Sequence, residues 1–307
     1  MSADGDMNSV KDTRSKRILR RRVDFLNEVL APERKLRIAD VGANPVNRPN
    51  YADLLELGAC EVWGFEPDES AFAELLESPQ PGAHYIQQAV GRTGPGKFHC
   101  HPVVPLGSIY PIRKESVAYL GHPRWYKPDA PIMDVELRSL DDIDELPRVD
   151  VLKMDIQGSE LDVIQTGKDK LSEAIAIIPE VRFYRMYEEE PMFGTLDCEM
   201  HDQGFALHKF EFTKSKIVGN SQRKKMWYPA FRTQLIDGDA VYIRNPETMS
   251  DWTDEQVKNL ALASAAVFFS LDLTVYCLDE MVRRKLVDEN VPERFLSVLP
   301  RWLFKDG

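Results

Sequence analysis

The sequence has few cysteines, and no two of them have the spacing of a metal or redox motif. Its four cysteines, Cys60, Cys100, Cys198 and Cys277, are far apart and form no Cys-x-x-Cys pair. Such usage is typical of a reducing compartment and indicates neither a zinc knuckle nor a disulfide framework. The N-terminal residues also lack the apolar segment of a secretory signal peptide. We therefore expect a cytoplasmic protein.

An excess of basic residues is also lacking. The chain of 307 residues has 50 acidic and 39 basic residues and a formal net charge of −11. This charge repels polyanions, so we expect no nucleic-acid partner. The basic residues that do cluster lie in 14–22. We interpret them as the solvated face of a helix whose apolar stripe is Leu19, Val23, Leu26 and Leu30.

No uninterrupted apolar run of membrane-spanning length is present. The most apolar stretch, 260–278, contains Asp272 and several small or polar residues. We interpret this stretch as a buried helix rather than a membrane span. Its apolar residues recur at helical spacing, which favours core packing or a homodimer contact through the C-terminal helices.

Short apolar runs alternate with helical patterns along most of the chain. This alternation is typical of an α/β fold with a mostly parallel sheet covered on both faces. The predicted strands are 37–41, 61–65, 84–90, 151–156, 175–181, 205–212 and 240–244, and the predicted helices are 51–57, 69–77, 160–166 and 196–202. The sequence therefore predicts a Rossmann-like sheet of seven strands.

We divide the chain into a helical arm (1–32), a central domain (33–248) and a helical segment (249–307). Within the central domain, residues 91–147 are rich in Gly, Pro, His and aromatic residues. We predict that they form an irregular insertion that serves as a lid or binding loop. A second irregular patch, 214–232, is basic with interleaved aromatic residues. Its basic run either meets an acidic sugar or phosphorylated carrier or is simply solvated.

Two features predict a nucleoside-containing cofactor. A buried strand that includes Asp40 runs into Gly42, where the backbone can turn tightly at the ligand-binding edge of the sheet. Glu66 directly follows the next strand, where its carboxylate can accept hydrogen bonds from ribose hydroxyls. The turn lacks the G-x-G-x-x-G pattern of a pyrophosphate site, and Pro45 removes a donor. The turn thus favours S-adenosylmethionine over NAD, although an NAD-dependent oxidoreductase remains an alternative.

The most informative segment is DVLKMDIQGSEL, residues 150–161. Lys153 and Asp155 alternate with apolar residues and therefore share one face of a predicted central strand. An unpaired buried charge is costly, so we expect the two side chains to meet each other or a ligand. The alternative is a structural ion pair at the strand end, with Gly158 as a simple turn.

The run DVLKMDIQGSELDVIQTG (150–167) resembles the signature of the FkbM-type methyltransferase family. IADVGAN, GFEPDE, QAVG, SLDDI and PEV occur around it in the expected order, so the resemblance covers about residues 37–181. It implies a class I methyltransferase fold, S-adenosylmethionine as methyl donor, and a sugar or other hydroxylated acceptor. One departure is that Val46 replaces the family's second glycine, so we expect the loop 45–50 to take a different path.

The resemblance also implies positions for the donor. The turn after the first strand faces its methionine part, Glu66 holds its ribose, and Ala89 and Val90 flank its adenine. The full set of expected donor-binding residues is Asp40, Gly42, Ala43, Asn44, Glu66, Pro67, Ala89, Val90 and Gln157.

Removal of the acceptor's hydroxyl proton needs a base or a metal. Asp155 and Glu180 are the predicted pair, either as base and orienting group or as oxygen ligands of a divalent cation. Lys153 is expected to pair with Asp155 or to stabilise the developing alkoxide, and Glu160 is a further candidate. For Glu180 the alternative is a sheet-edge carboxylate paired with Arg182.

Acceptor binding is assigned to residues near the insertion and after the fifth strand, namely Ser108, Tyr110, Arg182 and Tyr184. Loop aromatic residues also serve as packing residues, so this assignment has a structural alternative. A second alternative concerns the whole chain. A methyltransferase-like fold can persist as a binding or assembly module without catalysis, because fold does not determine function.

Overall fold

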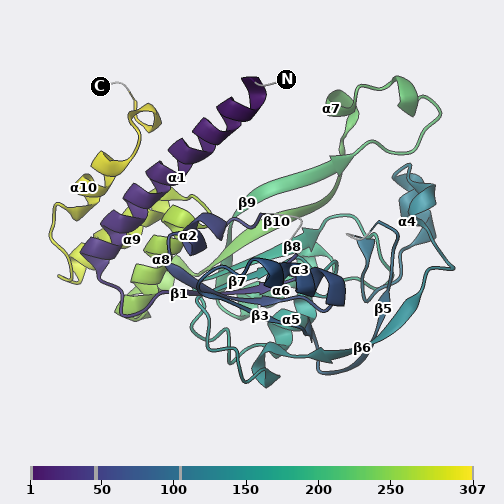
Figure 1. Ribbon diagram of the computed structural model, residues 1–307, viewed down its shortest axis with the longest axis horizontal. Helices are drawn as coiled ribbons and strands as arrows, with labels where there is room; N and C mark the ends of the chain where they lie inside the picture. The colour runs from purple at the N-terminus through teal and green to yellow at the C-terminus, as the bar shows by residue number, and fades with distance from the viewer. Residues whose placement is uncertain (1–2, 45–47, 104–105, 306–307) are drawn as a thin grey trace.

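A seven-stranded sheet forms the centre of the molecule (Figure 1). The computed structural model describes residues 3–44, 48–103 and 106–305, with the backbone alone described for 3–14. The strands lie in the order β3 (Ala83–Ile86), β2 (Cys60–Phe65), β1 (Leu36–Val41), β7 (Val151–Met154), β8 (Ala176–Arg182), β10 (Gln234–Arg244) and β9 (Phe205–Lys216). The strands from β3 to β8 pair in parallel, and β10 is antiparallel to both neighbours. The predicted Rossmann-like sheet is confirmed.

Four short helices lie between the strands, close to their predicted positions. They are α2 (Ala52–Glu56), α3 (Glu69–Glu77), α5 (Glu160–Thr166) and α6 (Phe193–Asp202). Helix α3 begins where expected because the Asp68 carboxylate accepts a hydrogen bond from the Ala71 amide at 2.9 Å and caps the helix. Apolar residues of α5 and α6 pack with one face of the sheet in a common core.

The opposite face of the sheet is covered by helices from both ends of the sequence (Figure 1). They are α1 (Ala3–Leu30), α8 (Asp254–Ala266), α9 (Leu271–Arg283) and α10 (Val291–Val298). The predicted apolar stripe of α1, formed by Leu19, Val23, Leu26 and Leu30, is buried and packs in one core with Leu36 of β1. These helices are therefore continuous with the core of the sheet.

The apolar stretch 260–278 forms parts of two helices. Helix α8 ends at Ala266 and α9 begins at Leu271, with Phe269 between them at a φ of 49°. None of the helices in the described residues is long and apolar enough to cross a membrane. Val267 and Phe268 are buried inside the chain, so intramolecular packing accounts for apolar residues that suggested a homodimer contact.

The insertion 91–147 is more ordered than the sequence predicts. It contains β5 (Gly94–His99) and β6 (Ile132–Arg138), which form a second sheet with β4 (Ala89–Val90), and the helices α4 (Lys114–Tyr119) and η2 (Pro123–Trp125). The expectation of an irregular loop was wrong here because β5 begins Gly-Pro-Gly and buries none of its residues, so no apolar alternation marks it.

The β9–β10 hairpin (residues 205–244) rises above the body of the sheet (Figure 1). Both strands extend beyond their predicted bounds, β9 to Lys216 and β10 back to Gln234. A short helix, α7 (Tyr228–Phe231), lies near its tip. The hairpin extends past the other strands. The outer residues of β9, 213–216, are polar, and the outer part of β10 places Leu235 and Ile236 side by side, so neither shows the alternation that predicts a strand.

Candidate active site

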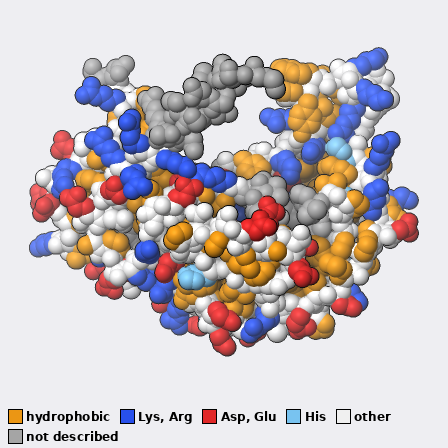
Figure 2. Space-filling model, viewed as in Figure 1, with side chains coloured by type: hydrophobic (Ala, Val, Ile, Leu, Met, Phe, Trp, Pro, Cys, Tyr) orange, Lys and Arg blue, Asp and Glu red, His pale blue; other side chains and the backbone are white. Residues whose placement is uncertain are grey.

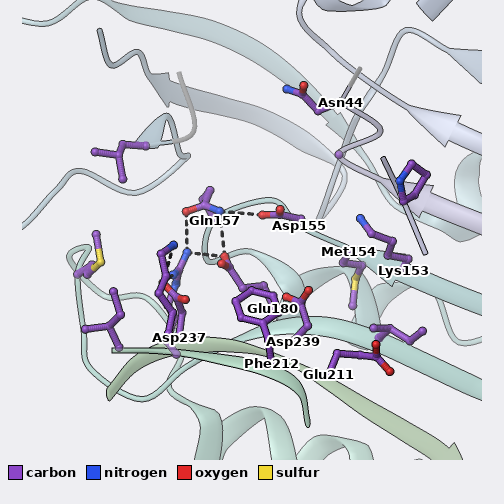
Figure 3. Close-up of a pocket in the computed structure, with 18 of the residues that line it drawn as sticks. Asn44, Lys153, Met154, Asp155, Gln157, Glu180, Glu211, Phe212, Asp237 and Asp239 are labelled. Atoms are coloured by element: carbon purple, nitrogen blue, oxygen red, sulfur yellow. Dashed lines mark hydrogen bonds and ion pairs between the residues drawn. The ribbon is translucent and has the colours of Figure 1, made fainter. Parts of the chain in front are cut away.

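A cavity of about 680 Å³ opens at the carboxyl ends of β1, β7 and β8 and is closed on one side by the β9–β10 hairpin (Figure 3). This is the edge of an open α/β sheet at which ligands bind. The polar residues that line it include Asp40, Asn44, Lys153, Asp155, Gln157, Glu180, Arg182, Glu211, Lys214, Lys216, Asp237 and Asp239.

The turn after β1 is built on Gly42. Its φ is +87°, and a Cβ atom there would lie 2.4 Å from the carbonyl oxygen of Asp155. The amides of Gly42 and Ala43 both donate to the carbonyl of Phe65 at 3.0 Å, and the amide of Asp155 donates to Val41. The predicted tight turn therefore brings the end of β1 directly against the end of β7.

Lys153 pairs with Asp40 rather than with Asp155, which corrects the expected partner. Its Nζ lies 3.2 Å from Asp40 Oδ1, because Asp40 and Lys153 are opposite each other in the parallel β1–β7 register. The phenol of Tyr51 donates to the other oxygen of Asp40. Burial alone would lower the pKa of Lys153, but the charges of Asp40 and Asp155 raise it above its usual value. Lys153 therefore remains protonated.

Gln157 connects the polar side chains of the site (Figure 3). Its Nε2 donates to Asp155 Oδ1 at 2.7 Å and to Glu180 Oε2 at 2.9 Å, and its Oε1 accepts from Arg182 Nη2 at 2.7 Å. The backbone of Gln157 has a φ of 59°, and Gly158 follows at 119°. This left-handed turn ends β7 and directs the amide of Gln157 into the cavity.

Glu180 forms a buried ion pair with Arg182, as the structural alternative proposed. The two side chains are 2.6 Å apart, and Arg182 also contacts Asp237 at 3.0 Å and Glu190 at 3.5 Å. Strand β8 is central rather than at the sheet edge, so burial raises the pKa of Glu180 while Arg182 opposes that rise. Glu180 therefore holds Gln157 in place and is not a free base.

Glu160 does not line the cavity. Its carboxylate is buried and accepts hydrogen bonds from the amides of Ile156, at 3.2 Å, and Gly158, at 2.9 Å. Burial raises the pKa of this group to about 7. The side chain supports the turn after β7, so we do not propose a catalytic role for it.

Of the four expected acceptor-binding residues, only Arg182 lines the cavity. Ser108 is buried and donates to the carbonyl of Gln157 at 2.7 Å, so it supports the turn. Tyr110 lies beside a smaller neighbouring cavity. The ring of Tyr184 packs on Tyr119 with centroids 5.3 Å apart. The packing of Tyr184 matches the alternative that the sequence left open for aromatic residues.

The expected donor-binding residues divide into two groups. Asp40, Gly42, Asn44 and Gln157 line the cavity, as does Asp155 beside them. The remaining ones, which lie outside the lining, are Ala43, Glu66, Pro67, Ala89 and Val90. The expected change of path at Pro45 and Val46 falls outside the described residues.

Glu66 follows β2 and remains close to the edge of the site. Its side chain is almost buried, and Oε1 accepts a hydrogen bond from the amide of Asp68 at 2.8 Å. Burial raises the pKa of this carboxyl. Beyond this one hydrogen bond, a carboxylate has room to accept further bonds from a ligand's hydroxyls.

Two carboxylates of the β9–β10 hairpin, Asp237 and Asp239, line the cavity but were not predicted from the sequence. Asp239 of β10 lies opposite Glu180 of β8 and shares the same space with Asp155 (Figure 3). Burial and the charge of Asp155 raise the pKa of Asp239 to about 6. The signal was present, because Asp237 and Asp239 lie on one face of a strand that continues into the apolar run 240–243.

The charges in the cavity are not all paired. Asp40 is paired with Lys153, and Glu180 is paired with Arg182. Asp155 and Asp239 have no ion-pair partner among the described residues. No group of three His, Cys, Asp or Glu side chains placed to hold a metal ion occurs in the part of the chain that the structure describes.

Comparison with known proteins identifies this arrangement. Residues 40–207 match the methyltransferase FkbM domain. The chain belongs to the FkbM methyltransferase family. The match begins at Asp40 of β1 and ends within β9, so the predicted methyltransferase is confirmed, while β10 lies beyond the matched region.

Among curated relatives, this FkbM methyltransferase is similar to the 2-O-methyltransferase NoeI of Sinorhizobium fredii. The two are 29% identical over 172 residues, which cover 52% of this chain and 69% of that protein. Among solved structures it is similar to magnesium protoporphyrin IX methyltransferase of Synechocystis, with 11% identity, a TM-score of 0.35 and coverage of 76% and 83% of the two chains. A second, 1,6-didemethyltoxoflavin-N1-methyltransferase of Burkholderia thailandensis, has 11% identity, a TM-score of 0.31 and coverage of 79% and 86%. With TM-scores this low, these two structures carry no argument about the fold or the function, and the fold assignment rests on the strand order.

Proposed function

We propose that this FkbM methyltransferase transfers a methyl group from S-adenosylmethionine to a hydroxyl oxygen of a small or sugar-like acceptor. The observation that carries the proposal is the pair of carboxylates, Asp155 and Asp239, that face the cavity without an ion-pair partner among the described residues. The similarity to a 2-O-methyltransferase supports oxygen as the methylated atom.

The donor set at the end of β1 fits the chemistry of S-adenosylmethionine. When bound, this cofactor supplies an electrophilic methyl group on a cationic sulfonium. Asp40, held by Lys153 and Tyr51, and Asp155 line this end of the cavity, and their negative charges favour the cationic groups of the cofactor. The side chain of Asn44 lies beside them. Glu66 at the end of β2 is the acceptor for the ribose hydroxyls. None of these contacts requires the run of backbone donors that a pyrophosphate needs.

The acceptor's proton passes to the Asp155–Asp239 carboxylate pair. A base is most effective when its pKa is near the working pH, and burial together with Asp155 raises the pKa of Asp239 to about 6. The negative charge of Asp155 contributes to this rise, because it disfavours a second charge on Asp239. Gln157 fixes the carboxylate of Asp155 by its 2.7 Å hydrogen bond. Lys153 supplies a fixed positive charge next to the developing alkoxide.

Calorimetric titration tests the donor half of the proposal. The purified chain is titrated with S-adenosylmethionine, S-adenosylhomocysteine and NAD, and we expect micromolar affinity for the two adenosyl compounds only. Loss of charge-assisted hydrogen bonds in Glu66→Ala is expected to weaken that affinity by about 10- to 100-fold. Glu69→Ala, an exposed site on α3, is the matched control and should bind as the unmodified chain does.

An acceptor screen then tests the reaction. Sugars and glycolipid precursors are incubated with labelled donor, and the product is analysed for the methylated atom. A methylated hydroxyl supports the proposal. Absence of adenosyl binding would contradict it and favour the binding-module alternative, whereas methylation of nitrogen would contradict the choice of oxygen.

A further inference from the structure

The far end of the same cavity, away from the ends of β1 and β7, is basic. The hairpin contributes Lys214 and Lys216 to the lining, and its sequence between Phe212 and Ile236 has no Asp or Glu. In Figure 2, Lys and Arg side chains lie on the protruding part of the molecule next to the hydrophobic side chains at α7. In a chain with a net charge of −11, a local concentration of positive charge beside a cavity indicates a binding site for a negatively charged group.

Lys216 lines the basic end without forming an ion pair with any described residue. Lys214 lies 3.4 Å from Asp237, but Lys216 has no ion-pair partner among the described residues. Lys216 is half-buried, and its Nζ lies 5.6 Å from the ring centroid of Trp125. Burial lowers the pKa of Lys216, and the charges of Lys214 and Arg223 lower it further, while the charge of Asp237 opposes this in part. A bound anion would relieve this repulsion.

Residues of the insertion 91–147 contact the basic residues of the hairpin and fix their positions. The ring of Trp125 stacks on His122 with centroids 4.0 Å apart. Arg223 donates from Nη2 to His122 Nε2 at 3.0 Å and from Nη1 to the carbonyl of Leu120 at 2.6 Å. Burial and the charges of Arg223 and Lys216 lower the pKa of His122, so it accepts this bond as a neutral ring. A preformed arrangement of this kind differs from a solvated basic run.

Two other lysines of the hairpin, Lys224 and Lys225, are solvated. Lys224 and Lys225 are exposed and do not line the cavity. They follow Arg223 directly in the sequence and carry the same charge as Lys216. They therefore provide a matched control for any effect of charge alone.

We propose that Lys216, with Lys214 beside it, binds an anionic group of the acceptor, such as a carboxylate, sulfate or phosphate monoester. The acceptor then spans the cavity, with its anion at the basic end and its reacting hydroxyl at the Asp155–Asp239 end. Trp125, which lines the cavity, holds Lys216 in place for this contact. This inference rests on the proposed methyl transfer, because it names the class of acceptor for that reaction.

The test uses three probes that share one sugar ring: glucose 1-phosphate, glucuronate and methyl glucoside. Binding to the full-length chain is measured calorimetrically in saturating S-adenosylhomocysteine. We expect both charged probes to bind about tenfold more tightly than methyl glucoside, as one charge-assisted contact provides. In Lys216→Gln the charged probes should lose this advantage while methyl glucoside binds unchanged. Lys216→Arg should keep it, and so should Lys224→Gln.

The outcomes separate this inference from the proposed function. Equal binding of charged and neutral probes, or an unchanged preference in Lys216→Gln, would overturn the anion site, and binding of S-adenosylhomocysteine in the same sample would leave methyl transfer standing. If S-adenosylhomocysteine does not bind, the methyl-transfer proposal fails. A charge preference that depends on Lys216 would then still support an anion site in this cavity.

Discussion

The parallel strands and the β9–β10 hairpin build the same cavity in different ways. On the parallel side, the site depends on backbone turns at Gly42 and Gln157, and its charges are largely paired, as in Asp40 with Lys153. On the hairpin side, the site depends on alternate side chains of two long strands, and Asp239 and Lys216 have no ion-pair partner in the described residues. The parallel side therefore fixes where the side chains of the site lie, and the hairpin side supplies charged side chains without ion-pair partners among the described residues.

The largest expected effect tests whether the two sides act together. Asp155→Asn and Asp239→Asn should each lower turnover of the screened acceptor by about 10²- to 10⁴-fold, because each removes part of the base. Affinity for S-adenosylhomocysteine should change far less in Asp239→Asn. Asp134→Asn, on the exposed surface of β6, is the control. Full activity of Asp239→Asn would show that Asp239 is not part of the base and that only residues of the parallel side, such as Asp155, accept the proton.

The second prediction concerns the backbone on the parallel side. Gly42→Ala should reduce the free energy of unfolding by about 3 kcal/mol or more, because the new Cβ meets the Asp155 carbonyl and φ is +87°. Gly58→Ala also has a positive φ, +70°, but open space around it, so about 1 kcal/mol is expected. Chemical denaturation measures both. Equal losses would show that the close approach of β1 and β7 has no special role.

The third prediction is a pH dependence. Asp239 keeps its proton below a pKa of about 6, so turnover should rise with pH through that value as the base is freed. In Asp155→Asn the residual activity should show this inflection at lower pH, because one cause of the raised pKa is removed. Rate profiles between pH 5 and 8 measure it. An unshifted inflection would contradict coupling between the two carboxylates.

The same carboxyl gives a stability signature. A raised pKa in the folded chain means that ionising Asp239 costs stability as the pH rises from about 4 towards 6. Asp239→Asn should therefore be at least as resistant to denaturant at pH 7.5 as the unmodified chain, despite its lost activity. A less stable variant would indicate a structural role instead.

The smallest effect is expected at the hairpin tip. Trp227 is 71% exposed, so Trp227→Ser should change the free energy of unfolding by less than about 0.5 kcal/mol. Binding of S-adenosylhomocysteine should be unchanged, because the donor contacts lie on the parallel side. A clear loss of donor affinity in this variant would show that the two sides are not as separate as the comparison implies.

The parallel side could be predicted from the sequence because its signals are local. An apolar run followed by Gly42 predicted a tight turn, and the helical pattern at 69–77 predicted α3 with the bounds that the structure has. The partner of Lys153 could not be predicted this way. Asp155 is two residues away, about 7 Å along a strand, whereas Asp40 lies directly across the ladder at about 5 Å. Only the register between strands decides between them.

The hairpin side was less predictable for a related reason. Strand β10 was expected to begin at Ala240, where its apolar run begins, so Asp239 was left outside the sheet. The outer residues of the hairpin are polar in β9, and in β10 they place Leu235 next to Ile236, so neither strand shows the alternation that predicts strands. Lys216 lies beside Trp125, which is far from it in the sequence, and near Arg223, which follows it in the hairpin. The sequence alone does not indicate either neighbour.

The shared core of α1 and α8–α10 has a consequence for synthesis on the ribosome. The amide of Glu33 donates to the carboxylate of Glu255 across 222 positions, and α1 packs on helices that are translated after the whole sheet. Until those helices emerge, the face of β1 that carries Leu36 and Ile38 has only α1 and α2 to cover it. The nascent chain therefore completes its sheet with one apolar side only partly covered, and this interval is when it most needs protection from aggregation.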